Sequence, residues 1–500
     1  RKKLMLLHTV FSLTLAGVWW GTGDGRGCAL AWAEGVDSPL NQSAPHRSFG
    51  RGKPRARGAS EPRADLGARG RVFDRLCQDA ETFPEIALTP LDGAGLSARD
   101  AALAGAIHHE VGRRWVTLRF LLEHHLSRPF TKLDAPVRAA LLGGAAQLLL
   151  LDRVPAHAAI DTSVEWVKGH NPKAAALVNA VLRGVSRITD ERIDAWDDRR
   201  DAIPLSDGSA RQLKEDVLPE DALERVGVAT GVPVSLIKKW SERVGEENAR
   251  ALALHTLCDP PITLNVTYAE APVEGTEAHE VDGYAVFTGA REELGKLLSS
   301  RRDVWVQDAG SGGAMDVAKD VRPSLVVDLC AGKGTKTRQL AAMFPGAVIL
   351  ATDVDKSRFG ALSRAFAGSE RVRVLGMDEL RREALERADL VVLDVPCSNT
   401  GVLPRRAEAK YRVRKKQQER LMEIQRQIVA DSIPLLAPDG RVLYSTCSLE
   451  PEENEAMALW LGQWHAFEVE SESRTEPKGA PGEPGRVYRD GGYAALMRRK

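Results

Sequence analysis

The chain has 500 residues, which is enough for two or three domains of ordinary size. Lysine and arginine together number 69, as do aspartate and glutamate, so the net charge is zero and does not by itself indicate a nucleic-acid-binding protein. The six cysteines are scattered and no two form a Cys-x-x-Cys pair, so the sequence indicates neither a zinc cluster nor a disulfide framework. Reduced thiols in a cytosolic enzyme fit this pattern better.

The first residues have the pattern of a secretory signal. Arg1-Lys2-Lys3 precedes an apolar run over residues 4–20, and small residues at 29–33 mimic a cleavage site. The run is too short and too poorly flanked for a transmembrane helix. Residues 35–70 are rich in Arg, Gly, Pro and Ser, which is typical of a disordered tether. We expect residues 1–67 to be a disordered or misassigned N-terminal extension.

Helical periodicity begins at residue 68. Apolar side chains recur at the spacing of one helix face in two places: Leu118, Leu121, Leu122 and Leu126, and then Leu141, Ala145, Leu148 and Leu149. This spacing predicts an all-α domain over residues 68–190. The next stretch is charged and rich in turn residues, so we expect a linker over residues 191–232.

Residues 233–310 are expected to form a small α/β subdomain that leads into the last part of the chain. Leu236, Ile237 and Trp240 share a helix face, and a strand-like segment begins at Pro260. The remaining residues, 311–500, are assigned to a further domain because short apolar strands and helical segments alternate along them.

A glycine-bearing turn follows the first apolar run of this last domain. Residues 325–329 have the composition of a buried parallel strand, and a turn leads from them toward a helix: Cys330-Ala331-Gly332-Lys333-Gly334-Thr335-Lys336. The next strand ends in Asp353, about twenty residues further on, where a carboxylate can bind ribose hydroxyls. The pattern predicts a nucleotide-type site on a doubly wound sheet. Its spacing does not separate a dinucleotide from S-adenosylmethionine.

Two cysteines and another aspartate stand at the ends of later strands. One apolar strand ends in Asp394-Val395-Pro396-Cys397-Ser398, and a later strand ends in Thr446-Cys447-Ser448. Open α/β sheets place their ligands and chemistry at the carboxyl ends of strands. A nicotinamide-dependent oxidoreductase on a similar sheet would leave Cys397 and Cys447 unexplained.

The order of these motifs resembles that of the RNA cytosine-5 methyltransferases of the RsmB (Fmu, Sun) type. That family carries a Cys-Ala-Ala-Pro-Gly-Gly-Lys-Thr-like loop, an Asp-Ala-Pro-Cys-Ser motif and a Thr-Cys-Ser motif, and the resemblance covers residues 70–500. It implies an α/β fold, with a Rossmann-like S-adenosylmethionine methyltransferase domain and a mostly parallel central sheet at residues 311–500. Residues 152–161 and 178–183 resemble a NusB-like RNA-binding domain, which implies that role for residues 68–190. Periodicity alone would fit a helical packing domain.

The resemblance implies covalent catalysis by a thiol. Cys447 matches the family's nucleophile, which adds to carbon 6 of cytosine and makes carbon 5 able to attack a methyl sulfonium. Cys397 matches the second cysteine, which assists loss of the carbon 5 proton and release of the methylated RNA. DNA cytosine methyltransferases take their nucleophile from the Pro-Cys motif, so Cys397 is the alternative nucleophile. Asp394 is expected near both the cofactor and the cytosine ring, and it can donate to ring nitrogen 3 only if protonated.

The cofactor that the resemblance implies is S-adenosyl-L-methionine. Its expected contacts are Asp353, Asp378, Asp394 and the loop residues Cys330, Ala331, Gly332, Lys333, Gly334, Thr335 and Lys336. The family has Ala/Ser-Pro-Gly-Gly where this chain has Gly332-Lys333-Gly334-Thr335. We expect binding to survive with an altered loop. The departure is the only support for the alternative that the protein is a catalytically weak, RNA-binding ribosome-assembly factor.

A basic segment follows the Pro-Cys motif at residues 404–416, with seven basic residues, one acidic residue and Tyr411. Next to an active site such a segment can hold phosphates while its tyrosine stacks on a base, so we expect RNA contact there rather than a solvated face. The resemblance implies 16S rRNA as the partner, with tRNA as the alternative, and a monomer without metal or membrane. An enzyme that needs RNA and S-adenosylmethionine is expected in the cytoplasm, which disfavours an export signal at residues 1–33.

Overall fold

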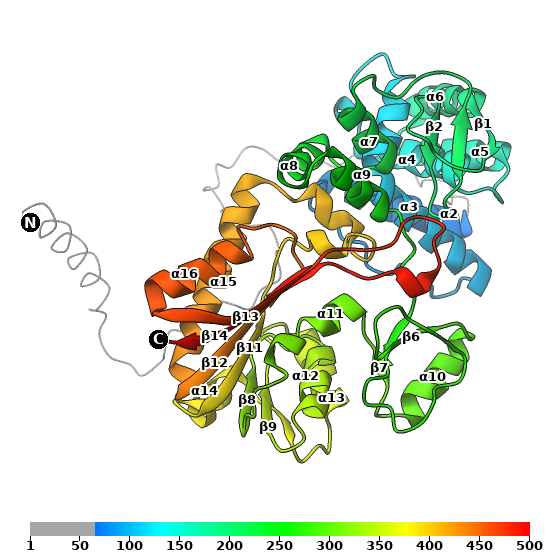
Figure 1. The fold of residues 1–500 in the computed structure, drawn as a ribbon. Coiled ribbons are helices and arrows are strands. Elements are labelled where there is room, and N and C mark those ends of the chain that lie inside the picture. Colours follow the sequence, from blue (N-terminus) through cyan, green and yellow to red (C-terminus); the bar gives the residue numbers. More distant parts are fainter. Residues whose placement is uncertain (1–65) are drawn as a thin grey trace, which may run out of the picture.

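The computed structural model describes residues 66–500, and its N-terminal part is a bundle of helices (Figure 1). Residues 1–65, which hold nearly all of the expected N-terminal extension, lie outside the described residues. The bundle consists of α2 (Gly67–Thr82), α3 (Ala98–Glu123), α4 (Ala135–Leu150), α5 (Ala156–Lys168) and α6 (Ala175–Ile188). The all-α region expected from the periodicity is confirmed.

Helix α4 lies in the centre of the bundle because its residues are almost all small or apolar and can be buried on nearly every side. Gly144 allows a close approach: a Cβ atom there would come within 2.5 Å of Leu182 Cδ1 in α6. Leu118, Leu121 and Leu122 of α3 are fully buried in the same core, as their spacing predicts.

The segment 191–232, expected to be a linker, is folded. Its antiparallel sheet has the order β1-β3-β2, with α7 (Ala222–Thr230) after it: β1 (Thr189–Ile193), β2 (Ala202–Pro204) and β3 (Ala210–Leu213). Trp196, Ile203 and Leu218 are buried in the same core as the helical bundle. The linker prediction is wrong because strands of three to five residues leave too little apolar periodicity to be recognised in a charged segment.

The segment 233–310 divides between two neighbours. Helices α8 (Val234–Val244) and α9 (Glu246–His255) bury Trp240 and Ala249 in the core of the helical bundle, instead of in a separate subdomain. The residues after them form an antiparallel sheet in the order β5-β6-β4-β7, next to α10 (Arg291–Ser300): β4 (Thr263–Asn265), β5 (Thr276–Ala278), β6 (Tyr284–Phe287) and β7 (Trp305–Val306). The expected small subdomain is therefore limited to this sheet and its helix.

The C-terminal part is built on a seven-stranded sheet in the order β10-β9-β8-β11-β12-β14-β13. Its strands are β8 (Leu325–Asp328), β9 (Val348–Ala351), β10 (Val372–Val374), β11 (Ala388–Asp394), β12 (Leu436–Thr446), β13 (Phe467–Thr475) and β14 (Gly492–Arg499). The pairings from β10 to β12 are parallel, and those that β14 makes with β12 and β13 are antiparallel. The expected mostly parallel central sheet is confirmed.

Helices cover both faces of this sheet (Figure 1). They are α11 (Ala309–Gly313), α12 (Thr335–Met343), α13 (Lys356–Ala365), α14 (Met377–Ala384), α15 (Lys415–Ser432) and α16 (Glu455–His465). Val326 packs with Leu340 of α12, whereas its neighbour Val327 packs with Ile428 of α15. Successive strand residues point to opposite faces, so a continuous apolar strand buries both of them. No helix within residues 66–500 is long and apolar enough to cross a membrane.

The strand order reverses beside β8. The chain runs from β8 to β9 and β10 on one side, and then returns to place β11 and β12 on the other. Such a switch point leaves a crevice outside the carboxyl ends of the two strands that flank it, here β8 and β11. The glycine-bearing loop follows β8 and the Pro-Cys motif follows β11, so both sequence motifs meet at this crevice.

Candidate active site

The thiols of Cys397 and Cys447 lie side by side. Strands β11 and β12 are parallel neighbours with Asp394 opposite Ser445, so the loops after both strands leave the sheet at the same edge. Cys397 Sγ and Cys447 Sγ are 3.2 Å apart. Cys397 is buried and Cys447 is partly exposed. The structure therefore brings together the two cysteines that the motifs singled out.

Cys397 keeps its proton and Asn399 contacts both cysteines. The hydrogen bond with Cys447, and then burial, raise the pKa of Cys397 well above its usual value. Cys447 Sγ is 3.2 Å from Asn399 Oδ1, and Asn399 Nδ2 donates to the carbonyl oxygen of Cys397 at 2.9 Å. The sequence reasoning missed Asn399, although an amide side chain directly after the Pro-Cys-Ser motif is a signal that could have found it.

A buried carboxyl group, Glu453, connects the two cysteine loops. Its Oε2 accepts hydrogen bonds from the backbone nitrogen of Ser398 at 2.8 Å and from Gln425 Nε2 at 3.1 Å, and its Oε1 accepts one from Ser448 Oγ at 3.2 Å. Burial raises the pKa of Glu453. An acidic run at a helix start is expected to stabilise the helix dipole, but Glu453 precedes α16 and instead fixes the backbone beside both thiols.

Asn454 fixes the end of β12. Thr446 Oγ1 donates to Asn454 Oδ1 at 2.6 Å, and Asn454 Nδ2 donates to the carbonyl oxygen of Ser448 at 2.9 Å. Thr446 and Ser448 flank Cys447, so this one side chain holds the backbone on both sides of the thiol. Both Thr446 and Asn454 are buried, which keeps water from competing for these hydrogen bonds.

An ion pair joins the thiols to the glycine-bearing loop. Lys336 Nζ, in the first turn of α12, is 2.5 Å from Asp394 Oδ1, and Ser445 Oγ donates to the same oxygen at 3.1 Å. Burial acts to lower the pKa of Lys336, but Asp394 and the two thiols outweigh it and raise this pKa above its usual value. This arrangement puts a positive charge in the same site as the two thiols.

The glycine-bearing loop makes a tight turn from β8 into α12. Gly332 and Gly334 have φ angles of +59° and +93°, a region that glycine adopts without strain. The backbone nitrogen of Gly332 donates to Asp353 Oδ2 at 2.9 Å, so the loop and the end of β9 are held together. A Cβ atom at Gly332 would meet nothing within 4 Å, which leaves this part of the backbone open to a ligand. Lys333, which replaces the family's proline, is exposed.

The remaining residues expected at the cofactor lie along the same edge of the sheet. Asp353 is buried after β9, Asp378 is exposed in the first turn of α14, and Thr335 begins α12. Burial raises the pKa of Cys330 well above its usual value, which keeps that thiol protonated. Ala331 is buried beside it.

Asp328, at the end of β8, is a buried carboxyl group that the sequence reasoning did not single out. Burial raises the pKa of Asp328 to about 7. The hydrogen bond from Thr337 acts to lower this pKa, whereas the nearby Asp394 and Asp353 act to raise it. Thr337 Oγ1 donates to Asp328 Oδ2 at 2.7 Å. The signal for Asp328 is its position as the last residue of a strand that enters the glycine-bearing turn.

The first half of the basic segment docks onto the helical bundle. Tyr411 is buried, with its hydroxyl 3.2 Å from the carbonyl oxygen of Arg113 and 3.2 Å from the backbone nitrogen of Trp115. Lys410 Nζ donates to the same carbonyl oxygen at 2.7 Å. The backbone of α3 is not helical at Arg114, where φ is −117°, and the bend leaves this carbonyl group available. Tyr411 therefore has no face free to stack on a base, which corrects that expectation.

The second half of the same segment is open to solvent. Arg414, Lys415 and Lys416 are exposed at the start of α15. Arg405, in contrast, is used internally, because its guanidinium pairs with Asp490 at 2.7 Å and with Asp308 at 3.2 Å. The candidate contact with RNA is thus reduced to Arg406 and the exposed end of the segment.

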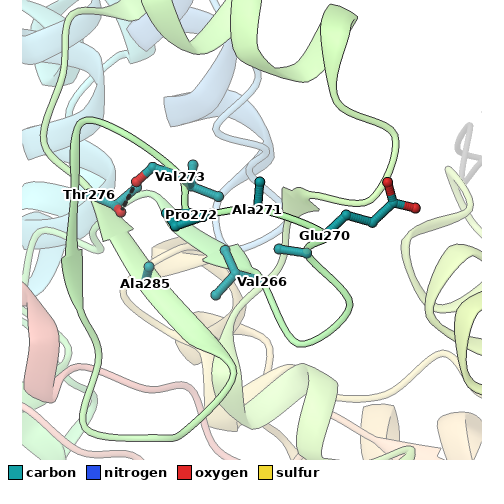
Figure 2. Close-up of a pocket in the computed structure, with 8 residues that line it drawn as sticks. Val266, Glu270, Ala271, Pro272, Val273, Thr276 and Ala285 are labelled. Carbon is teal, nitrogen blue, oxygen red and sulfur yellow. Dashed lines mark hydrogen bonds between the residues drawn. The ribbon is translucent and has the colours of Figure 1, made fainter.

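A cavity of about 350 Å³ lies away from this site, in the antiparallel sheet formed by β4 to β7 (Figure 2). Its walls are mostly apolar and come from Val266, Ala269, Glu270, Ala271, Pro272, Val273, Thr276 and Ala285. None of the residues expected at the site lines it. Within residues 66–500, no group of three or more His, Cys, Asp or Glu side chains is placed to hold a metal ion.

Comparison with known proteins agrees with this geometry. Residues 318–486 match the family model of the 16S rRNA methyltransferases RsmB/F, and residues 72–187 match the NusB family. The ribosomal RNA small subunit methyltransferase B of Erwinia tasmaniensis is 28% identical over 425 residues, which are 81% of this chain and 92% of that protein. The protein of the same name from Klebsiella pneumoniae is 28% identical over 457 residues, or 86% of this chain and 97% of that protein.

The fold has a solved counterpart, the crystal structure of the protein PH0851. It superposes with a TM-score of 0.62 at 20% identity and covers 88% of this chain and 100% of its own. The sheet and the loops at its switch point define a Rossmann-like methyltransferase of the S-adenosylmethionine-dependent class. The two family matches, in the same order along the chain as the helical bundle and the seven-stranded sheet, confirm the resemblance seen in the sequence.

Proposed function

We propose that the protein methylates carbon 5 of a cytosine in RNA, with 16S rRNA as the substrate and Cys447 as the nucleophile. The observation that carries the proposal is the pair of sulfur atoms 3.2 Å apart at the ends of adjacent strands. A single thiol would suffice for addition to the base, and the second thiol provides a separate group for the release step. The names of the related proteins and of the matching family support rRNA as the substrate.

The residues at the switch point fit S-adenosylmethionine. The backbone of Gly332 is open to a ligand, Asp353 follows β9, and Asp378 lies in the first turn of α14 at the same edge of the sheet. We propose that these residues, with Cys330, Ala331, Lys333, Gly334, Thr335, Lys336 and Asp394, hold the cofactor. Carboxylates can bind the ribose hydroxyls, and an open glycine turn lets the ligand approach the backbone closely. When bound, S-adenosylmethionine supplies an electrophilic methyl group on a sulfonium.

Cys447 acts first in this proposal. Its thiol first loses its proton to solvent. The thiolate then forms a bond from Sγ to carbon 6, and the electron pair of the bond between carbons 5 and 6 moves onto carbon 5, which becomes nucleophilic. Lys336 contributes a positive charge to the same site. Asp394, as the carboxylate paired with Lys336, can accept a hydrogen bond from the exocyclic amino group of cytosine.

Cys397 acts second. The bond from Cys447 Sγ to carbon 6 removes the hydrogen bond that is the first cause of the raised pKa of Cys397, and with it the charge of Cys447, which is a smaller cause than burial. Cys397 can then lose its proton to solvent and take the proton from carbon 5. The electron pair left on carbon 5 restores its double bond to carbon 6, and Cys447 Sγ leaves as a thiolate. Cys447 then takes a proton back from solvent, so the cycle releases one proton overall and both cysteines return to their starting thiol states.

The experiment that tests the proposal is transfer of labelled methyl groups to RNA by the purified protein. Protein-free 16S rRNA, tRNA and DNA are offered in parallel, and bisulfite sequencing locates the modified cytosine. We expect 5-methylcytosine at one position of 16S rRNA. Label in tRNA alone would support the tRNA alternative. Binding of S-adenosylmethionine without label in any RNA would support a weak assembly factor instead. We also propose that the protein acts as a monomer in the cytoplasm, because its RNA substrate and its cofactor are found there.

A further inference from the structure

Asn399 occupies a backbone position that few residue types adopt easily. Its φ angle is +59°, in the left-handed region, where Asn and Gly are the favoured residues. It lies between Cys397 and the short 3₁₀ turn η4 (Thr400–Val402). Glycine would satisfy the turn, so the amide side chain is not needed for the backbone. Its two contacts, with Cys397 and with Cys447, are therefore the features to explain.

The orientation of the Asn399 amide follows from chemistry. The carbonyl oxygen of Cys397 can only accept a hydrogen bond, so the group 2.9 Å from it must be the Nδ2 donor. The other amide atom, Oδ1, then faces Cys447 Sγ at 3.2 Å. An amide oxygen can only accept, so the hydrogen of the Cys447 thiol points toward Asn399.

This orientation also settles the direction of the contact between the thiols. Because the Cys447 hydrogen is directed at Asn399, the hydrogen between the two sulfur atoms must come from Cys397. The raised pKa of Cys397 agrees with a thiol that keeps its proton. The hydrogen bonds form one chain, from Cys397 through Cys447 to Asn399, and the last acceptor sets the direction of the whole chain.

We infer that Asn399 is a positioning residue for Cys447: its amide oxygen holds the thiol proton on one side of the sulfur and fixes the direction in which the sulfur presents its lone pairs. The inference rests on the proposed role of Cys447 as the nucleophile. It adds a residue that neither cysteine motif contains. When the sulfur is held in one orientation, its lone pairs stay aligned for attack on the base. A thiol that rotates freely would lose this alignment.

Other groups also act on Cys447, and the test has to separate them from Asn399. The titratable or charged side chains around it come from four segments: Cys397 after β11, Lys336 in α12, Asp394 in β11 and Glu453 before α16. None of them changes in a substitution at position 399. Asn399→Gly keeps the left-handed backbone and removes the amide. Asn399→Asp keeps the size and shape and replaces the amide with a carboxylate.

The readout is the pH profile of Cys447 alkylation by iodoacetamide, followed by mass spectrometry of the peptide that contains it. A hydrogen bond to the neutral thiol disfavours ionisation, so Asn399→Gly should move the midpoint of the profile to lower pH. A carboxylate next to the sulfur should move it to higher pH in Asn399→Asp, by about one pH unit or more. We expect kcat for methyl transfer to fall about tenfold in both variants with KM for RNA unchanged. Melting temperature and S-adenosylmethionine affinity serve as controls of folding.

Unmoved midpoints in both variants, or a shift in the same direction in both, would overturn the inference and leave Asn399 as a turn residue only. A raised KM with unchanged kcat would also overturn it, because it would indicate an RNA contact. Alkylation needs neither RNA nor S-adenosylmethionine, so this result stands apart from the proposed function. That function would instead fail if Cys447→Ala retained methyl transfer.

Discussion

Lys336 Nζ and Asp394 Oδ1 lie 2.5 Å apart, so a single ion pair connects the first turn of α12 to the end of β11. The glycine-bearing loop enters α12, and the Pro-Cys motif leaves β11. The pair therefore ties the proposed cofactor site to the proposed nucleophile site, and neither half can move independently while it is intact. Both thiols also act to raise the pKa of Lys336.

We predict that Lys336→Met destabilises the protein and slows alkylation of Cys447 at pH 7. Asp394 would keep a charge without its partner; its side chain is 34% exposed, so solvent limits the loss to about 1–2 kcal/mol. Because the folded pKa of Lys336 is raised, the contribution of the pair is fully present below the ordinary lysine pKa of ~10.4 and is lost as pH rises through the folded value. Urea denaturation at pH 7 measures the loss. Lys333→Met, in the exposed part of the same loop, is the matched control and should leave stability unchanged.

Asp353→Ala is expected to remove most of the affinity for S-adenosylmethionine. The substitution deletes a carboxylate proposed to bind ribose hydroxyls, and charge-assisted hydrogen bonds of this kind are worth ~1.5–3 kcal/mol, or about 10- to 150-fold in Kd. It also removes the acceptor that holds the backbone nitrogen of Gly332. Calorimetric titration measures the affinity. Glu379→Ala, an exposed acid on α14, should bind as the wild type does. Equal affinity in all three proteins would place the cofactor elsewhere.

Neutralising Lys415 and Lys416 should weaken RNA binding and reduce its dependence on salt. Both side chains are exposed at the start of α15, close in sequence to the Pro-Cys motif. Each lost phosphate contact lowers the slope of log K against log salt by ~0.7 for single-stranded RNA. Binding titrations at several salt concentrations measure the slope. The control removes the charges of Arg291 and Lys296, which are exposed on α10. The same small change in both double variants would mean that the α15 charges form an ordinary solvated surface.

The sheet and the residues at its strand ends could be predicted because each motif is local. A short apolar run followed by a turn indicates a strand. Asp394 ends one such strand, Cys397 lies in the loop after it, and Cys447 directly follows another. The burial of Tyr411 could not be predicted in this way, because its partners Arg113 and Trp115 lie far earlier in the chain. It depends on a bend in α3 and on the docking of two domains, and no pattern around residue 411 records either.

The residues that support the thiols were missed for a related physical reason. Glu453 occurs in an acidic run that composition attributes to a helix start, and only the folded chain brings it to Ser398 and Gln425. Asn399 fits a turn by its residue type, and its contact with Cys447 depends on β11 and β12 being parallel neighbours. Sequence patterns identify groups that carry chemistry. They do not identify the groups that hold those residues in place, because such groups are selected by contact.

The roles of the two thiols give the sharpest prediction. Cys447→Ala should abolish methyl transfer and leave cofactor binding intact, because no bond to carbon 6 can form. Cys397→Ala should still form the adduct through Cys447, but carbon 5 would keep its proton and the RNA would stay attached. A protein–RNA complex that resists denaturation should therefore accumulate in Cys397→Ala and not in Cys447→Ala, as measured by gel electrophoresis in denaturant.

The double substitution is the control for this experiment and should trap no RNA. Removing either partner also ends the contact between the sulfur atoms at 3.2 Å, so the two single variants differ only in which thiol remains to attack. A trapped complex in Cys447→Ala would exchange the two assignments and give the arrangement of the DNA enzymes, with Cys397 as nucleophile. Normal turnover without a trapped complex in both single variants would exclude covalent catalysis by either thiol, since no other cysteine is placed beside this pair within residues 66–500.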